Sequence, residues 1–156
     1  MPFHRLKPDR PCTIWRYSTI DAARSFQKMV FAYELWSGEP VFNDPPHYFV
    51  RRGVAEALRR LQLTGFEAID VTTIKATNYD EEQAAGREPE PVCWLKVHGQ
   101  PAVDDFGLQV KVRLIVSQPV LEVFKQHGMR LGQVEDYDPD YQPPSAADFL
   151  KRQEVT

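Results

Sequence analysis

The stretch HYFVRRGVAEALRRLQLTGFEAIDV, residues 47–71, decides the fold because it combines the residue pattern of β-strands with that of an amphipathic helix. It begins with an apolar, strand-like run and continues as a short amphipathic helix that ends at Gly65. A run rich in Ile, Val and Thr, residues 66–76, then predicts a second strand. The helix places apolar side chains on one face and arginines in solvent: Val54, Ala57, Leu58 and Leu61 against Arg51, Arg52, Arg59 and Arg60.

A fainter copy, LIVSQPVLEVFKQHGMRLGQVEDY, follows at residues 114–137. At an offset of 66 positions Val50 aligns with Val116 and Glu56 with Glu122. Ser117 can cap the second helix and Gly128 ends it. Before it, alternation over residues 108–116 predicts one half-buried strand. Both a duplication and simple reuse of a strand–helix–strand pattern explain the copy.

The remaining segments are less regular. Residues 1–17 read as an irregular or extended lead-in broken by prolines, and a capping signal at Ser18 predicts a helix over residues 19–33. Residues 34–49 read as a loop with at most a short edge strand, residues 78–91 as an acidic loop, and residues 92–98 as a strand. The sequence therefore predicts an α+β fold, with a mainly antiparallel sheet, two or three short helices packed on it, and Pro-rich loops.

Composition narrows the class of protein. The 156 residues, 42% of them hydrophobic, suit one globular domain spanning residues 1–156, with the irregular lead-in at its N-terminus and an acidic, Pro-rich segment at its C-terminus. With no signal-peptide pattern and no apolar run of membrane-spanning length, we expect a cytoplasmic protein. Residues 1–60 hold ten Lys and Arg against six Asp and Glu, and residues 61–156 hold nine against sixteen, so the second half is acidic.

The sequence carries no phosphate-binding loop, nucleophile elbow or paired metal-ligand motif, so we expect no cofactor or metal and no catalysis. The alternative is a small enzyme that uses His98 with Asp104 or Cys93. Cys12 and Cys93 are expected to be reduced and partly buried. A third possibility, RNA binding through the arginines of residues 51–60, is disfavoured by the acidic balance of the chain.

The stretch VEDYDPDYQPP, residues 134–144, alternates acidic and aromatic residues on a segment stiffened by proline. Aromatic side chains favour interface centres, and carboxylates speed encounter with a basic partner. A plain acidic linker is the alternative interpretation. The residues expected to bind a partner are those of this segment together with a second acidic pair: Asp136, Tyr137, Asp138, Asp140 and Tyr141, with Asp104 and Asp105.

VFNDPPHYFVRRGVAEALRRLQLTGFEAIDV resembles a segment of bacterial immunity proteins from polymorphic toxin systems, in which an extended start leads into a short helix and a Leu-Thr-Gly-Phe-Glu ending. Here that ending is residues 63–67, and the resemblance covers about residues 34–71. It implies a protein that binds a cognate toxin domain in the cytoplasm and occludes its active site without catalysis. Nucleic acid and membrane are not partners in this interpretation.

Overall fold

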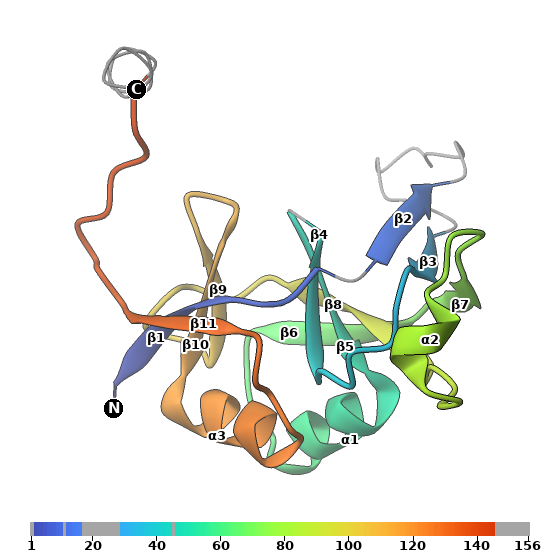
Figure 1. Ribbon diagram of the computed structural model, residues 1–156. Coiled ribbons are helices and arrows are strands. Elements are labelled where there is room, and N and C mark those ends of the chain that lie inside the picture. Colours follow the sequence, from blue (N-terminus) through green and yellow to red (C-terminus); the bar gives the residue numbers. More distant parts are fainter. Residues whose placement is uncertain (1, 11, 17–28, 45, 146–156) are drawn as a thin grey trace, which may run out of the picture.

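The computed structural model describes residues 2–10, 12–16, 29–44 and 46–145 of the chain. These residues form an α+β fold with mainly antiparallel sheets and short helices packed on them, which confirms the predicted fold class. Figure 1 shows α1 and α3 side by side, both on the same side of the central strands.

The strands are arranged in two four-stranded sheets and one three-stranded sheet. Sheet A has the order β11-β1-β10-β9, with bounds Gln133–Asp136, Phe3–Lys7, Arg113–Ser117 and Phe106–Gln109. Sheet B has the order β4-β5-β8-β6, with bounds Val41–Asp44, His47–Arg51, Val92–Val97 and Phe66–Asp70. Sheet C has the order β2-β3-β7, with bounds Cys12–Arg16, Met29–Tyr33 and Thr72–Lys75. The helices are α1, α2 and α3, with bounds Arg52–Arg60, Glu81–Ala84 and Gln118–Gln126.

Sheets A and B have the same topology. The units β4-β5-α1-β6 and β9-β10-α3-β11 run in the same order, and β5, α1, β10 and α3 begin and end at positions that differ by 66. In each unit the third strand of the sheet comes from elsewhere in the chain: β8 lies between β5 and β6, and β1 lies between β10 and β11. Both inserted strands are antiparallel to their neighbours. Strand β1, which precedes the first unit in the chain, thus completes the sheet of the second unit, and β8, which precedes the second unit, completes the sheet of the first.

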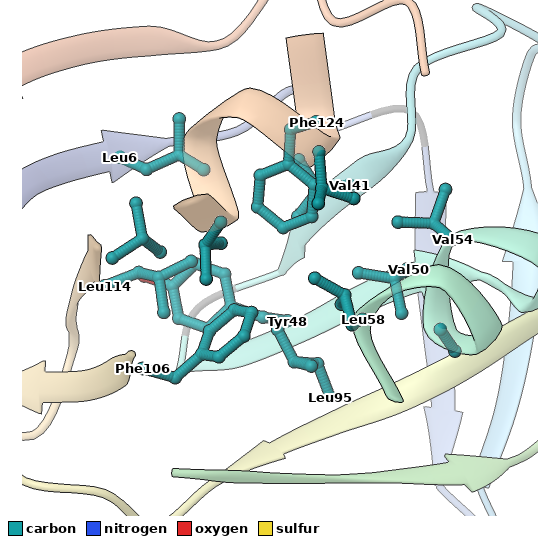
Figure 2. Close-up of a cluster of buried hydrophobic side chains, with 14 of the residues drawn as sticks. Leu6, Val41, Tyr48, Val50, Val54, Leu58, Leu95, Phe106, Leu114 and Phe124 are labelled. Carbon is teal, nitrogen blue, oxygen red and sulfur yellow. The ribbon is translucent and has the colours of Figure 1, made fainter. Parts of the chain in front are cut away.

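One hydrophobic core joins the two units. Helix α1 packs on β5 and β8, α3 packs on β10 and β1, and the two helices contact each other. Figure 2 shows that Leu58 of α1 and Phe124 of α3, which are equivalent in the repeat, lie in the same cluster as side chains from both sheets. Both are 0% exposed, and burying a side chain of this size contributes about 1.5–3 kcal/mol.

A second, aromatic core lies between sheets B and C. Phe31 and Tyr33 of β3 pack against Phe42 and Phe49 of sheet B. The Phe31 and Tyr33 rings meet edge to face with centroids 4.7 Å apart, and the Phe31 and Phe49 centroids are 5.1 Å apart. Such aromatic pairs add about 0.5–1.5 kcal/mol beyond the area they bury.

The predicted helix over residues 19–33 is wrong at its C-terminal end, because Met29–Tyr33 forms strand β3. The apolar residues there match a helical stripe, but Phe31, Ala32 and Tyr33 are all 0% exposed, as expected for a strand covered on both faces. Residues 19–28 are outside the described part of the chain. Of the two forms expected for the lead-in, irregular or extended, the structure has the extended one, since the segment contains β1 and β2.

The predicted strand over residues 108–116 is a hairpin of β9 and β10. Val110 and Lys111 have φ values of 45° and 70°, which reverse the chain, although a β-branched residue rarely adopts positive φ. Leu108 and Leu114 lie opposite each other across the turn, so every second residue remains apolar through the hairpin. The sequence pattern therefore does not reveal the turn. Residues 66–76 likewise divide into β6 and β7, which belong to different sheets.

Three further expectations need correction. The apolar stripe predicts that Leu61 lies on the buried face of the first helix, but Leu61 is 57% exposed because α1 ends at Arg60. The acidic loop of residues 78–91 contains the short helix α2, capped by the Asp80 side chain. The C-terminal acidic segment contains strand β11. The stretch SAADFLKRQ, residues 145–153, predicts a short terminal helix capped by Ser145, and residues 146–153 lie outside the described part of the chain.

Candidate functional site

The acidic edge, our name for Asp136, Tyr137, Asp138, Asp140 and Tyr141, lies at the end of β11 and just beyond it. Strand β11 is an outer strand of sheet A and pairs with β1, as Figure 1 shows. Five of the seven predicted partner-binding residues are therefore on one border of one sheet. Strand β11 carries Asp136 and the other four residues follow it, and the sequence pattern does not reveal this strand.

Three contacts hold this segment against sheet A. The Tyr137 backbone N–H donates to the Phe3 carbonyl at 3.1 Å. The Gln109 side-chain amide donates to the Asp138 carbonyl at 2.7 Å. The Arg113 guanidinium lies 3.6 Å from the centre of the Tyr141 ring, which is cation–π stacking. The acidic edge is thus a structured segment, in contrast to the plain linker interpretation.

Among the described residues, the carboxylates of the acidic edge have no basic partner. Asp136, Asp138 and Asp140 are exposed, and no ion pair to any of them is present among the described residues. Glu135 differs, because it lies 3.5 Å from Arg5 and 3.9 Å from Arg113. Three uncompensated negative charges on a fixed segment form a surface suited to a basic partner.

The second predicted acidic pair has a different environment, since both carboxylates hold local structure. The Asp105 carboxylate accepts hydrogen bonds from the Thr64 backbone N–H at 2.9 Å and the Ser117 hydroxyl at 2.7 Å. Because of this bond, the Ser117 hydroxyl does not cap α3 as expected. The Asp104 carboxylate accepts from the Gln100 backbone N–H at 2.8 Å. These residues stabilise the turn after α1 and the loop before β9.

The contact between the Asp105 carboxylate and the Thr64 N–H has a counterpart in the other unit that the sequence does not reveal. Glu39, 1% exposed, accepts backbone N–H donors from Arg130 at 3.0 Å and Leu131 at 2.6 Å. Arg130 is equivalent to Thr64 in the repeat. Glu39, before the β4–β5 hairpin, therefore binds the turn after α3, just as Asp105, before the β9–β10 hairpin, binds the turn after α1. The pairing joins residues that are 91 positions apart, and no local pattern announces it.

The residues of the alternative enzyme site do not form a hydrogen-bonded constellation in the described part of the chain. The Cys93 thiol is 0% exposed and donates to the Asp70 carboxylate at 3.2 Å. Burial raises the pKa of Cys93 to about 11, and the hydrogen bond to Asp70 acts in the same direction. The His98 ring is exposed, and within the described residues no hydrogen bond joins it to Cys93 or Asp104. The geometry does not provide an activated thiolate.

We expect iodoacetamide to alkylate Cys93 at pH 8 at least a hundredfold more slowly than a free cysteine peptide. A thiol with a pKa of about 11 is roughly one part in a thousand thiolate at pH 8, and burial also blocks access. The measurement is mass spectrometry of the Cys12→Ser variant over time, with the same protein unfolded in urea as the positive control. Rapid labelling of the folded protein would restore Cys93 as a candidate nucleophile.

Three of the four arginines within residues 51–60 form hydrogen bonds or ion pairs that the sequence does not reveal. Arg51 is not in solvent: its guanidinium donates to the Glu39 carbonyl at 3.1 Å and the His127 carbonyl at 2.8 Å, and pairs with Glu90 at 2.8 Å. Arg52 pairs with Asp70 at 3.2 Å, and Arg59 donates to the Ala68 carbonyl at 2.7 Å. The arginines therefore form no continuous free basic face, which argues against the RNA-binding alternative.

A shallow groove of about 520 Å³ runs between α1 and β6, with Arg59, Leu63 and Phe66 in its lining. It lies at the outer border of sheet B, the counterpart of the acidic edge in sheet A. Over the described ranges, no three His, Cys, Asp or Glu residues gather as metal ligands, and no helix has the length and apolar character of a membrane span. Comparisons with protein-family models, curated proteins and solved structures found no significant match to this chain.

Proposed function

We propose that this protein is a cytoplasmic immunity protein that binds a cognate bacterial toxin domain and occludes its active site. The observation that supports the proposal most directly is the acidic edge, where exposed carboxylates are carried on a segment held by Gln109 and Arg113. Toxins that attack nucleic acids need a basic groove for their substrate. A fixed row of carboxylates is complementary to such a groove.

The anchoring of the segment matters for affinity. A flexible acidic tail would lose conformational entropy on binding, whereas a segment already held in place loses less. The aromatic rings of Tyr137 and Tyr141 are partly buried next to the carboxylates, so the surface offers apolar contact area as well as charge. Occlusion requires only such surface complementarity and no catalytic group on this chain.

Reversing two charges of the acidic edge, in the variant Asp136→Lys/Asp140→Lys, is expected to slow association with the toxin at least tenfold and to weaken its salt dependence. Attraction between this surface and a basic groove raises the association rate constant, and salt screens it. Asp138 stays unchanged because its carboxylate accepts the Asp140 backbone N–H at 2.9 Å. Stopped-flow association at several salt concentrations measures both effects.

The control is Glu56→Lys/Glu82→Lys, which changes the net charge by the same amount at exposed sites on other parts of the surface. If both double variants slow association equally, the effect comes from net charge and the acidic edge is outside the interface. The partner itself is found by affinity purification from the native host and mass spectrometry. Co-expression of that partner with and without this protein then tests neutralisation, and a partner that is harmless alone contradicts the proposal.

A further inference from the structure

Strand β11 leaves half of its backbone hydrogen-bonding groups facing away from sheet A. The register pairs His4 with Asp136 and Leu6 with Val134, and the bond from the Tyr137 N–H to the Phe3 carbonyl fixes the alternation. In an antiparallel pair, alternate residues direct both their N–H and C=O away from the partner strand. Here those residues are Val134 and Asp136. Both are exposed, and no described strand pairs with their outer side.

The equivalent strand of the other unit shows how such a border can be covered. Ala68 of β6 corresponds to Val134, and its outward carbonyl accepts a hydrogen bond from the Arg59 guanidinium at 2.7 Å. The residue equivalent to Arg59 is Lys125 of α3, which is exposed. Among the described residues no hydrogen bond from Lys125 reaches Val134. The β6 border is thus capped by its own helix, whereas the described residues leave the β11 border uncovered.

We propose that β11 receives an extended, Lys- or Arg-bearing segment of the partner as an additional antiparallel strand of sheet A. The identity of that partner rests on the proposed immunity function, but the strand-pairing surface does not. Backbone groups of Val134 and Asp136 supply the hydrogen bonds, and the nearby carboxylates of Asp138 and Asp140 select basic side chains.

Charge also selects against the simplest competing occupant, which is a second copy of this chain. Two β11 strands paired with each other would bring together Asp136 and the neighbouring Asp138 and Asp140 of both copies. Like charges directly opposite each other destabilise a strand pair. An unprotected sheet border otherwise invites such pairing, so the acidic residues keep the border available for a basic segment.

The test uses a defined probe, the capped peptide acetyl-Lys-Val-Lys-Val-Lys-Val-Lys-amide, and amide hydrogen exchange measured by NMR. In the free protein the Val134 and Asp136 amides are expected to exchange rapidly, since both point to solvent. The peptide is expected to slow both at least tenfold while leaving Ala68 unchanged. The matched peptide with Glu in place of Lys reports the contribution of charge, and one with proline at its centre reports the contribution of strand pairing. Neither control is expected to protect these amides.

Two proline variants sharpen the test. Val134→Pro removes an outward N–H without breaking a bond to β1, and proline is tolerated at such border positions. It is expected to weaken Lys-peptide binding at least tenfold, whereas Ala68→Pro, at the equivalent position of β6, is expected to leave binding unchanged. Asp136→Pro is the second variant should Val134→Pro lower the unfolding midpoint. Equal effects of substitution on β6 and β11, or no protection of Val134 and Asp136, would overturn strand addition.

The outcomes separate this inference from the proposed function. A toxin that this protein neutralises, but that leaves the Val134 and Asp136 amides unprotected in the complex, overturns strand addition and preserves the immunity proposal. A basic peptide that adds to β11, in a host where no toxic partner is found, preserves the strand surface and overturns immunity. Dimers that form without peptide and disappear in Val134→Pro would identify self-association as the use of this border.

Discussion

Replacing Glu39 with alanine is expected to lower the free energy of unfolding by about 3–5 kcal/mol. Its carboxylate is 1% exposed and accepts the backbone N–H groups of Arg130 and Leu131. A hydrogen bond to a charged group contributes about 1.5–3 kcal/mol, and the alanine variant leaves two backbone donors without their acceptor. It also releases the turn after α3 from the hairpin of the other unit. Urea unfolding followed by circular dichroism measures the loss.

Two variants control for this effect. Glu56→Ala removes an exposed carboxylate from α1 and is expected to change stability by less than about 0.5 kcal/mol. Asp105→Ala removes the equivalent carboxylate of the other unit, which is less deeply buried, so a smaller loss than for Glu39→Ala is expected. A loss at Glu39 no larger than that at Glu56 would show that the buried carboxylate does not stabilise the joint between the units.

Replacing Gly65 with alanine is expected to cost about 3 kcal/mol or more. Gly65 has a φ of 92°, and an added Cβ would lie 2.3 Å from the Phe106 carbonyl oxygen and 2.8 Å from the Asp104 Cβ. The Phe106 contact is with backbone and cannot be relieved by a side-chain rotation. We therefore expect the loop before β9 to shift away from the end of α1. Urea unfolding gives the stability, and amide exchange at Phe106, whose N–H donates to Thr64, locates the change.

Gly128 offers a matched control because its φ of 94° is nearly the same, yet nothing lies within 4 Å of the position its Cβ would take. Gly128→Ala carries only the backbone cost of positive φ, about 1–2 kcal/mol. The difference between the two variants isolates the close approach of the loop to Gly65. Equal losses at the two sites would mean that conformation alone, and not packing, requires glycine at position 65.

The parts of the fold that the sequence predicted are those whose signal is local. Helices α1 and α3 follow from their apolar stripes, and β8 follows from a short run of β-formers. The end of α1 was not predicted, because the helix ends at Arg60 and the positive φ after it falls on Gln62 and not on a glycine. The aromatic and acidic composition of residues 134–144 likewise singled out the segment that the structure places at the border of sheet A. None of these inferences needed knowledge of a partner element.

The parts that escaped depend on residues distant in sequence. Met29–Tyr33 is a strand because β2 and β7 pair with it in sheet C and its aromatic side chains pack against sheet B. Phe3–Lys7 is a strand because β10 and β11 lie on either side of it. Helical spacing and proline content gave the wrong local signal in both places. For the candidate site, the sequence indicated the charges of the segment but not the support from Gln109 and Arg113, which comes from the β9–β10 hairpin.

The reciprocal placement of β1 and β8 has a consequence for biosynthesis. As the chain leaves the ribosome, β1 appears before every other described strand, yet its neighbours β10 and β11 are among the last. Sheet B, by contrast, gains its central strand as soon as β8 is made. We therefore expect sheet B to assemble during translation, while β1 remains unpaired and accessible to chaperones until β10 and β11 have been synthesised. Emergence of β10 and β11 would then be the event that completes sheet A and, with it, the β11 border that the described residues leave uncovered.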